Sequence, residues 1–473
     1  MNVYEGTIKD CKIAYIGGGS RGWAWRLMAD LAMEPALSGK ISLYDIDKPA
    51  ARYNEIIGNR LSARTDVTGK WDYEVADGME EALTGADFVI LSILPGTLEE
   101  MHFDVHQPEE YGIWQSVGDT VGPGGIVRAL RTIPMYVEIA RGIKAYAPNA
   151  WVINYTNPMS LCIKTLYHVF PQIKAFGCCH EVFGTQKMLA NILQDEQAIT
   201  GVKRSEIMVN VVGINHFTWF TEASYKGIDL FPVYRKYVDS HYQTGYKKGD
   251  DSWLNQAFSS GQRVKFDLFL KYGFIAAAGD RHLAEFMPGD EYLKDPETVK
   301  EWMFSLTTVD SRKDQWKERL ERSGRLVRGE EEIELKPSGE EGVMLIKALC
   351  GLTRWISNVN IPNTGGQIPN LSKETVVETN AVFSKDHIRP VLAGEIPESI
   401  LSLVLPHAEN QEVILNAAMN CDFEAALSAL MNDPNAKAKI EKNQAHELLT
   451  QMLTHTAAFL PEQWNDVLAR RNK

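Results

Sequence analysis

Short apolar runs alternate with amphipathic segments over the first 175 residues of the chain. The runs that we expect to form strands are residues 12–16, 40–44, 88–94 and 151–154. Their apolar, β-branched composition is typical of the central strands of a parallel sheet. The segments with apolar residues at helical spacing are residues 25–33, 50–64 and 132–146. This regular alternation predicts an α/β fold, in which a doubly wound, Rossmann-like parallel sheet has helices on both faces.

The pattern changes beyond residue 175. Residues 174–178 and 209–214 are also predicted strands, but helical periodicity dominates from residue 251 and ends in an amphipathic stretch at 398–431. The change predicts a second, mixed α+β domain, and we place the two domains at residues 1–178 and 179–473. The charged run at 310–341 is expected to form a solvated helix and loop on the surface.

Composition narrows the classes of protein to which the chain can belong. Its 473 residues are 44% hydrophobic and 23% charged, close to the average of globular proteins. The net charge of −13 disfavours a nucleic-acid or membrane-surface partner, because phosphate groups and anionic lipids would be repelled. The N-terminus has no signal-peptide pattern, and no apolar run approaches the ~20 residues of a membrane span. Six cysteines are too few for a disulfide scaffold, so we expect a cytoplasmic protein.

A glycine-rich turn follows the first predicted strand. Its glycines lie directly before a predicted helix, where they allow close approach of a pyrophosphate and the helix N-terminus offers free N–H groups. Gly17, Gly19 and Gly22 satisfy the G-x-G-x-x-G spacing. Asp45 ends the next strand, where a carboxylate binds the ribose hydroxyls and repels a 2′-phosphate. The alternative is a structural turn followed by a surface aspartate, but the order of elements favours NAD over NADP. The predicted cofactor-binding residues are Gly17, Gly18, Gly19, Ser20, Arg21, Asp45 and Ser92.

Polar side chains follow three later strands, at the edge where ligands collect in open α/β sheets. Asn157 comes after the strand at 151–154, and Cys179 and His216 come after the next two. Thiolate and imidazole are good ligands for a divalent ion, and two protein ligands would leave positions free for substrate oxygens. Taken singly, Cys179 can be a buried thiol and His216 a core histidine. Their joint position predicts a catalytic metal site beside the nicotinamide.

Several motifs, in order along nearly the whole chain, carry a resemblance to a known family. They are GGGSRGW at 17–23, GDTVGPGG at 118–125, ALRTIP at 129–134, Asn157-Pro158, Cys-His-Glu-Val at 179–182, GINHF at 213–217 and IPNTGGQIPNLS at 361–372. The chain resembles the NAD- and manganese-dependent glycosidases of glycoside hydrolase family 4. The resemblance implies NAD and Mn²⁺ as cofactors and a small-molecule sugar as substrate. It also implies a C-terminal domain like that of lactate and malate dehydrogenases, and a homodimer or homotetramer.

The resemblance assigns roles to particular residues. Cys179 and His216 correspond to the manganese ligands of the family. Asn157 corresponds to a residue that contacts the sugar. The acid that assists the leaving group would be His180 or Asp119.

The base and the remaining substrate-binding residues are assigned less directly, because the family's tyrosine base has no clear counterpart here. Asp267 and Asp280 are the alternatives for the base, and a surface position for Asp267 is an equal alternative. Glu181, Arg281 and His282 are expected to bind substrate, and the planar guanidinium of Arg281 suits a carboxylate. The alternative for Arg281 is a structural ion pair within its own loop.

The tetrad at 179–182 resembles that of the α-galacturonidase branch, and residues 92–96 lack the arginine that phosphosugar members carry. The implied reaction oxidises C3 of an α-galacturonide with NAD⁺, eliminates the leaving group with help from manganese, adds water and returns the hydride. A paired-carboxylate mechanism would need no nicotinamide. Within the family, α-glucosidase, α-galactosidase and α-glucuronidase activities are the alternatives. From other classes, the alternatives are an NAD-dependent dehydrogenase of the 2-hydroxy-acid type and a non-catalytic NAD sensor.

Overall fold

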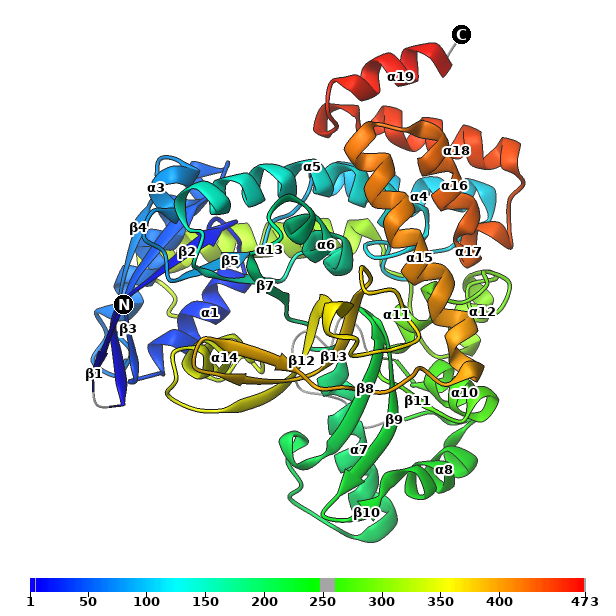
Figure 1. Ribbon diagram of the computed structural model, residues 1–473, viewed down its shortest axis with the longest axis horizontal. Helices are drawn as coiled ribbons and strands as arrows, with labels where there is room; N and C mark the ends of the chain where they lie inside the picture. Colours follow the sequence, from blue (N-terminus) through cyan, green and yellow to red (C-terminus); the bar gives the residue numbers. More distant parts are fainter. Residues whose placement is uncertain (5, 247–259, 472–473) are drawn as a thin grey trace.

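The computed structural model of the chain describes residues 1–4, 6–246 and 260–471 (Figure 1). Its largest feature is a sheet whose parallel strands lie in the order β4-β3-β2-β5-β6-β7. In that order the strands are Trp71–Val75, Leu37–Tyr44, Thr7–Ile16, Phe88–Leu91, Trp151–Asn154 and Lys174–Gly177. Numbered from the first parallel strand, this is the 3-2-1-4-5-6 order of dinucleotide-binding sheets. The predicted doubly wound sheet is confirmed, although the strand expected at 88–94 ends at Leu91.

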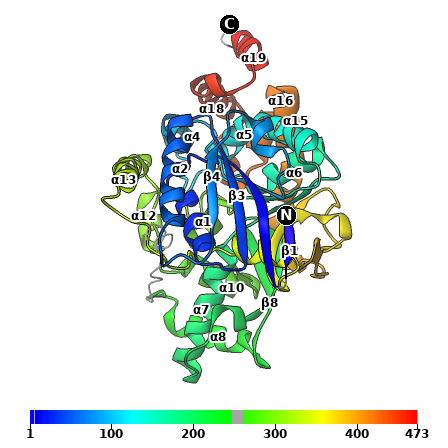
Figure 2. The same ribbon diagram turned by 90° about the vertical axis from the view of Figure 1, so that its left-hand side faces the viewer.

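Helices cover both faces of this sheet (Figure 2). One face carries α1 (Trp23–Ala32) and α2 (Lys48–Ser62), and the other carries α3 (Met79–Leu83), α5 (Gly122–Tyr146) and α6 (Met159–Val169). Successive residues of β2 point to opposite faces. Ile13 and Tyr15 pack with side chains of α1 and α2, whereas Ala14 and Ile16 pack with those of α3, α5 and α6. Burial on both faces explains the continuous apolar runs that mark these strands in the sequence.

The second half of the chain completes the same sheet. Its strands β12 (Trp355–Pro362), β13 (Val376–Ser384) and β14 (His387–Pro390) extend the sheet in that order beyond β7, each antiparallel to the one before. At the N-terminus, β1 (Asn2–Tyr4) pairs antiparallel with β2. Phe176 of β7 and Phe383 of β13 share one apolar core with side chains of α1 and α2. The division at 178/179 stays a prediction, and both the sheet and this core extend across it.

A second, antiparallel sheet contains β8 (Met208–Ile214), β9 (Phe217–Tyr225), β10 (Ile228–Asp229) and β11 (Ile275–Ala276). The helices α7 (Glu181–Gln197), α8 (Leu230–His241) and α10 (Arg263–Tyr272) pack against it around a core of their own. This is the mixed α+β region that the sequence predicts beyond residue 175. Of the helical tracts expected from residue 251, the part at 251–259 lies outside the described residues.

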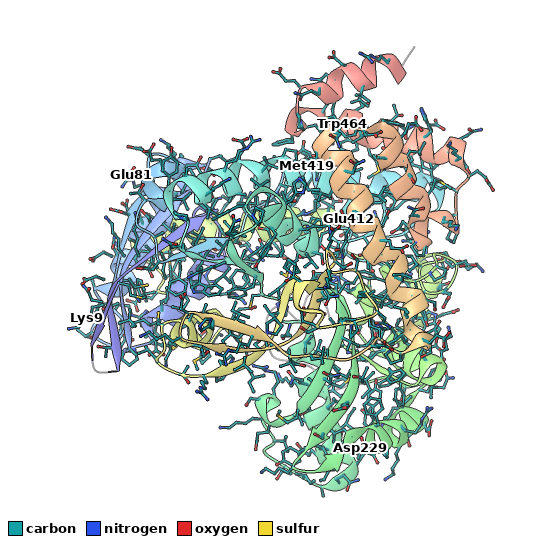
Figure 3. The ribbon with its side chains drawn as sticks, viewed as in Figure 1. Lys9, Glu81, Asp229, Glu412, Met419 and Trp464 are labelled. Carbon is teal, nitrogen blue, oxygen red and sulfur yellow. The ribbon has the colours of Figure 1, made fainter. Side chains whose placement is uncertain are left out.

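Helices close the C-terminal side of the molecule. They are α15 (Glu398–Asn420), α16 (Phe423–Asn432), α17 (Pro434–Lys437), α18 (Lys442–His455) and α19 (Gln463–Arg471). Trp464 of α19 is fully buried in a core that these helices share with α5, and Glu412 of α15 pairs with Lys164 of α6 (Figure 3). The amphipathic stretch expected at 398–431 is confirmed as two helices. Within the described ranges, no helix has the length and apolar character needed to cross a membrane.

The charged run at 310–341 forms α13 (Val309–Arg328) and the loop that leads to α14 (Gly342–Leu349). α13 is largely exposed, as predicted, but one side of it packs against α2 and α4 (Leu98–His106). Val309 and Leu326 are buried on that side. The run is therefore a surface helix with an inward face.

Candidate active site

The glycine-rich turn between β2 and α1 leaves no room for side chains. A Cβ added at Gly17, whose φ is +93°, would lie 2.0 Å from the carbonyl oxygen of Ser92. One added at Gly18 would lie 2.8 Å from the Cβ of Leu43. α1 begins at Trp23 without a side-chain cap, so its first N–H groups remain for a ligand. The turn therefore combines the close approach and the N–H donors that the pyrophosphate of NAD needs.

Asp45 is tied into the same turn. Its Oδ2 accepts a hydrogen bond from Gly19 N at 2.8 Å, and its Oδ1 accepts one from Asp47 N at 2.9 Å. Burial raises the pKa of Asp45, and these two N–H donors offset part of that rise. Arg21 Nη2 lies 3.7 Å from Asp47 Oδ2, so the predicted ribose carboxylate and the predicted Arg21 border the same turn.

A pocket opens at the carboxyl edge of the parallel strands, between β2 and β5. Tyr15, Trp23, Ser92, Tyr155 and Glu340 contribute to its wall. β2 and β5 are the neighbouring strands at which the strand order reverses, and dinucleotides bind at this switch point in such sheets. The glycine turn and the pocket together fit an NAD molecule, and Ser92 lies in the pocket wall, while its contact with the cofactor stays a prediction.

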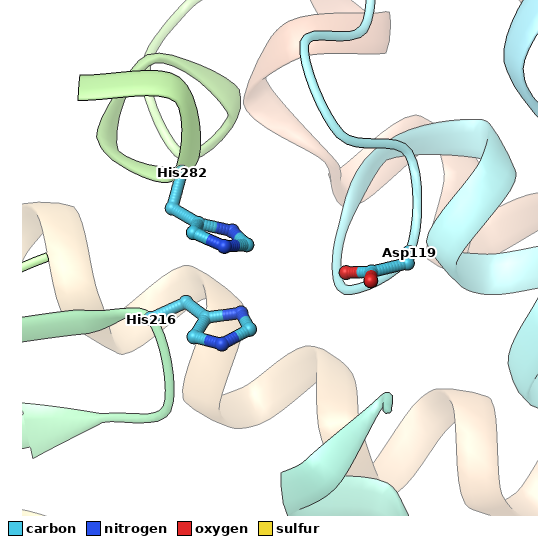
Figure 4. Close-up of side chains that lie close together, drawn as sticks. All are labelled: Asp119, His216 and His282. Carbon is cyan, nitrogen blue, oxygen red and sulfur yellow. The ribbon is translucent and has the colours of Figure 1, made fainter. Parts of the chain in front are cut away.

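Three side chains from distant parts of the chain converge in a second cluster (Figure 4). Asp119 precedes α5, His216 lies in the turn between β8 and β9, and His282 lies on α11 (Asp280–Glu285). Their ligating atoms all lie within 4.8 Å of one another. The two imidazole rings are 3.7 Å apart between centroids. Two imidazoles and one carboxylate fit a divalent transition-metal ion and leave coordination positions for a substrate.

Thr120 orients two members of this cluster. Its hydroxyl donates to Asp119 Oδ1 at 2.7 Å and lies 2.9 Å from His216 Nδ1. Because the single hydroxyl proton goes to the carboxylate, the hydroxyl can only accept from His216, which places the imidazole proton on Nδ1. Nε2 of His216 then keeps the lone pair that a metal ion requires.

Burial and neighbouring charges hold the cluster in the protonation states of metal ligands. Burial, followed by the nearby His282, lowers the pKa of His216 to about 3, and burial also lowers the pKa of His282. Burial alone would raise the pKa of Asp119, but Arg128 and the two histidines lower it below its usual range. Among the described residues, nothing hydrogen-bonds to His282 Nδ1, which is buried. At neutral pH two neutral imidazoles therefore face an ionised carboxylate, the forms that coordinate a metal.

The predicted metal ligand Cys179 is not part of this cluster as the described residues define it. It is buried after β7, where its carbonyl oxygen accepts from Asn358 Nδ2 at 3.0 Å. Burial, followed by the charge of Glu378, raises the pKa of the Cys179 thiol, so the thiolate needs a nearby cation. Glu378 also accepts from Asn215 Nδ2 at 3.2 Å, next to His216. Cys179 as a metal ligand stays a prediction.

The short helix α11 fastens the loop that carries Asp119. Arg281 donates from Nη2 to the carbonyl oxygen of Ser116, and its own carbonyl oxygen accepts from the Ser116 hydroxyl. Glu285 Oε1 accepts from the backbone N–H groups of residues 117 and 118 at 2.7 and 2.8 Å. These bonds give Arg281 a positioning role, whereas its predicted contact with substrate stays a prediction.

The two carboxylates predicted as alternative bases lie in different surroundings. Asp280 is fully buried and accepts from two N–H groups in the first turn of α10, at 3.2 and 3.0 Å. Asp267 accepts from the hydroxyls of Tyr242 and Tyr292 at 2.7 and 2.5 Å. Asp280 lies on the same helix as His282, whereas Asp267 is held by its tyrosines. The identity of the base stays a prediction.

The remaining predicted residues surround the cluster. Glu181 Oε1 lies 3.9 Å from the Nε2 atoms of both His180 and His282. Burial would raise the pKa of Glu181, but the nearby histidines lower it to about 2. Asn157 Nδ2 donates to Asp119 Oδ2 at 3.4 Å. The structure thus brings these predicted residues together at one site.

Comparison with known proteins identifies the family. A model described as "Family 4 glycosyl hydrolase" matches residues 12–195, and one described as "Family 4 glycosyl hydrolase C-terminal domain" matches residues 211–436. The chain belongs to family 4 of the glycosyl hydrolases. It is an enzyme of the glycoside hydrolase class with a sugar substrate, as the sequence predicts.

Relatives in family 4 match the chain over nearly its whole length. An α-galacturonidase of Lachnoclostridium phytofermentans is 62% identical over 98% of this chain and 100% of its own length. An α-galactosidase of Bacillus subtilis is 29% identical over 95% of this chain and 99% of its own.

Solved structures share the fold. The crystal structure of a Bacillus subtilis protein described as a glucosidase has a TM-score of 0.89 at 49% identity, covering 94% of this chain and 100% of its own. A 6-phospho-α-glucosidase from gut microorganisms, in complex with NAD and Mn²⁺, has a TM-score of 0.76 at 21% identity and covers 96% of this chain and 99% of its own.

Several residues of this family 4 site were not predicted from the sequence. Thr120 stands inside the GDTVGPGG motif, and its position next to Asp119 was a usable signal. Glu285 lies one helical turn after Arg281, so a shared helix face could have suggested it. Glu378 lies within a buried strand of apolar and polar residues, and nothing in the local pattern distinguishes it.

Proposed function

We propose that this protein is an NAD- and Mn²⁺-dependent α-galacturonidase. The observation that carries the proposal is the 62% identity, over 98% of this chain, to a protein named α-galacturonidase. The α-galactosidase relative is far more distant, at 29% identity. The absence of an arginine at residues 92–96 also argues against a phosphorylated sugar.

The residues present fit both cofactors. NAD would be held by the turn at Gly17–Arg21, by Asp45 and by Ser92. Mn²⁺ would be held by His216 together with Asp119 and His282, and Cys179 is a further predicted ligand. The chemistry that these groups supply when bound is hydride acceptance at C3 of the sugar, for NAD, and Lewis-acid polarisation of the C3 oxygen, for manganese.

The chain's own side chains would bind the sugar and move its protons. His180, whose side chain is 28% exposed, would protonate the leaving oxygen at C1. Asp119 is ionised, which suits a metal ligand better than an acid. Asp280 and Asp267 remain the alternatives for the base that removes the C2 proton, Asp280 buried against the first turn of α10 and Asp267 held by two tyrosine hydroxyls. Asn157, already in contact with Asp119, would orient a sugar hydroxyl.

A panel of substrates tests the proposal. Purified protein with NAD⁺, Mn²⁺ and a reductant is assayed in parallel on aryl α-galacturonide, α-glucuronide, α-galactoside and α-glucoside, with NAD-free and chelator-treated controls. We expect the largest kcat/KM on the galacturonide, and no activity in either control. Equal or faster cleavage of another glycoside would contradict the substrate. Accumulation of NADH without glycoside cleavage would instead support the dehydrogenase alternative.

We also infer a cytoplasmic location and a homodimer or homotetramer. The six cysteines are all unpaired, which suits a reducing compartment. Met208 and Leu392 are exposed apolar side chains, and a 2.8 Å hydrogen bond from Asn210 Nδ2 to the Ala393 carbonyl oxygen joins their segments. Exposed apolar side chains of this kind can be covered by a second copy. Sedimentation analysis of the purified protein tests the oligomer, and a monomer at micromolar concentration would contradict it.

A further inference from the structure

The N-terminal end of α13 is fastened to the loop that carries Asp119. Thr307 donates to the carbonyl oxygen of Ser116 twice, from its backbone N at 3.1 Å and from its hydroxyl at 2.8 Å. Val309 N, at the start of α13, donates to His106 Nε2 at 3.2 Å. The Ser116 carbonyl oxygen is also the acceptor for Arg281. The first turn of α13 therefore lies against the wall of the candidate active site.

Arg312 stands in this first turn, close enough to Asp119 and Arg281 for its charge to act on both. The charge of Arg312 lowers the pKa of Asp119. After burial, the charge of Arg312 is also the largest cause that lowers the pKa of Arg281. Burial lowers the pKa of Arg312, and the charges of Asp119 and then Glu285 offset part of that fall. The guanidinium is thus placed among the groups that border the metal cluster.

One nitrogen of Arg312 is buried and makes no hydrogen bond. Within the described part of the chain, Nη2 of Arg312 has no hydrogen-bond partner. A buried donor left without a partner costs about 1–3 kcal/mol. A ligand that accepts hydrogen bonds at this position would remove that cost.

Two other arginines near the cluster are already engaged with the backbone. Arg281 donates from Nη2 to the Ser116 carbonyl oxygen, and Arg128 donates from Nε to the Asn157 carbonyl oxygen at 3.0 Å. The charges of Arg128 and Arg312 act on Asp119, and that of Arg281 lies near Glu285, Glu181 and Asp119. Of these three guanidinium groups, that of Arg312 keeps a buried nitrogen for an anionic group of the sugar.

We propose that Arg312 is the residue that binds the C5 carboxylate of the substrate, in place of Arg281. The proposal rests on the proposed α-galacturonidase function and names its specificity-determining residue. A guanidinium binds a carboxylate through two parallel hydrogen bonds, which a neutral hydroxymethyl group at C5 cannot reproduce.

The test compares three variants on matched substrates. Arg312→Gln removes the charge, Arg312→Lys keeps the charge without the planar fork, and Lys313→Gln is the control. Lys313 is the next residue on α13, but it pairs with Glu99 at 2.8 Å. Each protein is assayed with NAD⁺ and Mn²⁺ on aryl α-galacturonide and on aryl α-galactoside, which share the C4 configuration. Titration calorimetry with galacturonate and with galactose measures binding without catalysis.

We expect Arg312→Gln to lower kcat/KM on the galacturonide about 10- to 100-fold, mainly through KM, and to weaken galacturonate binding by a similar factor. Activity on the galactoside and binding of galactose should stay near those of wild type, Arg312→Lys should be intermediate, and Lys313→Gln should resemble wild type. Thermal unfolding and NAD⁺ binding check that each variant is folded.

Two outcomes would overturn the proposal separately from the function. Equal losses on both substrates would show that Arg312 supports the cluster as a whole, and an unchanged affinity for galacturonate would show that it does not contact the carboxylate. By contrast, a wild-type enzyme that prefers the galactoside and does not bind galacturonate would overturn the proposed function itself.

Discussion

Replacing Thr120 by valine tests whether its hydroxyl prepares His216 for the metal. The hydroxyl donates to Asp119 Oδ1 at 2.7 Å and accepts from His216 Nδ1 at 2.9 Å. Valine has nearly the same shape, so Thr120→Val removes both bonds and leaves the cluster in place. A hydrogen bond to a charged group contributes about 1.5–3 kcal/mol, which corresponds to about a 10- to 100-fold change in an equilibrium constant. Loss of a partner that orients a metal ligand has effects of the same size on metal affinity.

We therefore expect the dissociation constant for Mn²⁺ to rise about 10- to 100-fold in Thr120→Val. Titration calorimetry on metal-free protein measures it directly, without reliance on turnover. Thr120→Ser keeps the hydroxyl and is the matched control, which should bind Mn²⁺ nearly as wild type does. If Thr120→Val binds Mn²⁺ as tightly as the serine variant, the hydroxyl does not set the tautomer of His216 and the reasoning is wrong.

Three further predictions concern the cofactor sites. In urea unfolding, Gly17→Ala should be about 1–3 kcal/mol less stable than the control Gly85→Ala. The added Cβ at Gly17 would meet the Ser92 carbonyl oxygen at 2.0 Å, whereas nothing lies within 4 Å of one added at Gly85. Equal losses of stability in the two variants would contradict the close packing of the turn. Asp45→Asn should narrow the preference for NAD over NADP, because the 2′-phosphate of NADP would no longer meet a carboxylate. If the wild-type protein binds NAD and NADP equally, the assigned role of Asp45 is wrong. Cys179→Ser should abolish activity and leave NAD⁺ affinity nearly unchanged, and retention of activity in the serine variant would exclude Cys179 as an essential ligand.

The dinucleotide end of the protein could be predicted from the sequence because its determinants are local. The turn at Gly17–Gly19 follows directly from β2, and the bond from Gly19 N to Asp45 spans 26 residues. Strands buried on both faces are apolar throughout, so their positions are visible as continuous runs. His216 was also predicted, since it follows a recognisable strand and lies in the turn after β8.

The metal cluster and its surroundings depended on tertiary structure. Thr120 and His216 are 96 residues apart, Ser116 and Arg281 are 165 apart, and Thr307 and Ser116 are 191 apart. No local pattern reports on contacts of this separation, because periodicity reflects which face of an element is buried but not which element buries it.

The same limit explains the particular differences from the sequence analysis. The charged run at 310–341 is typical of a solvated helix, and most of α13 is one. Only the folded chain brings the first turn of α13, which contains Arg312, next to the loop that carries Asp119. Asp267 is a candidate base by residue type, and only the folded chain shows that its carboxylate accepts from two tyrosine hydroxyls; which of Asp267 and Asp280 is the base stays a prediction. Residue type and spacing therefore determined which chemistry the chain carries, and the long-range packing of loops on helices decided which side chains share one site.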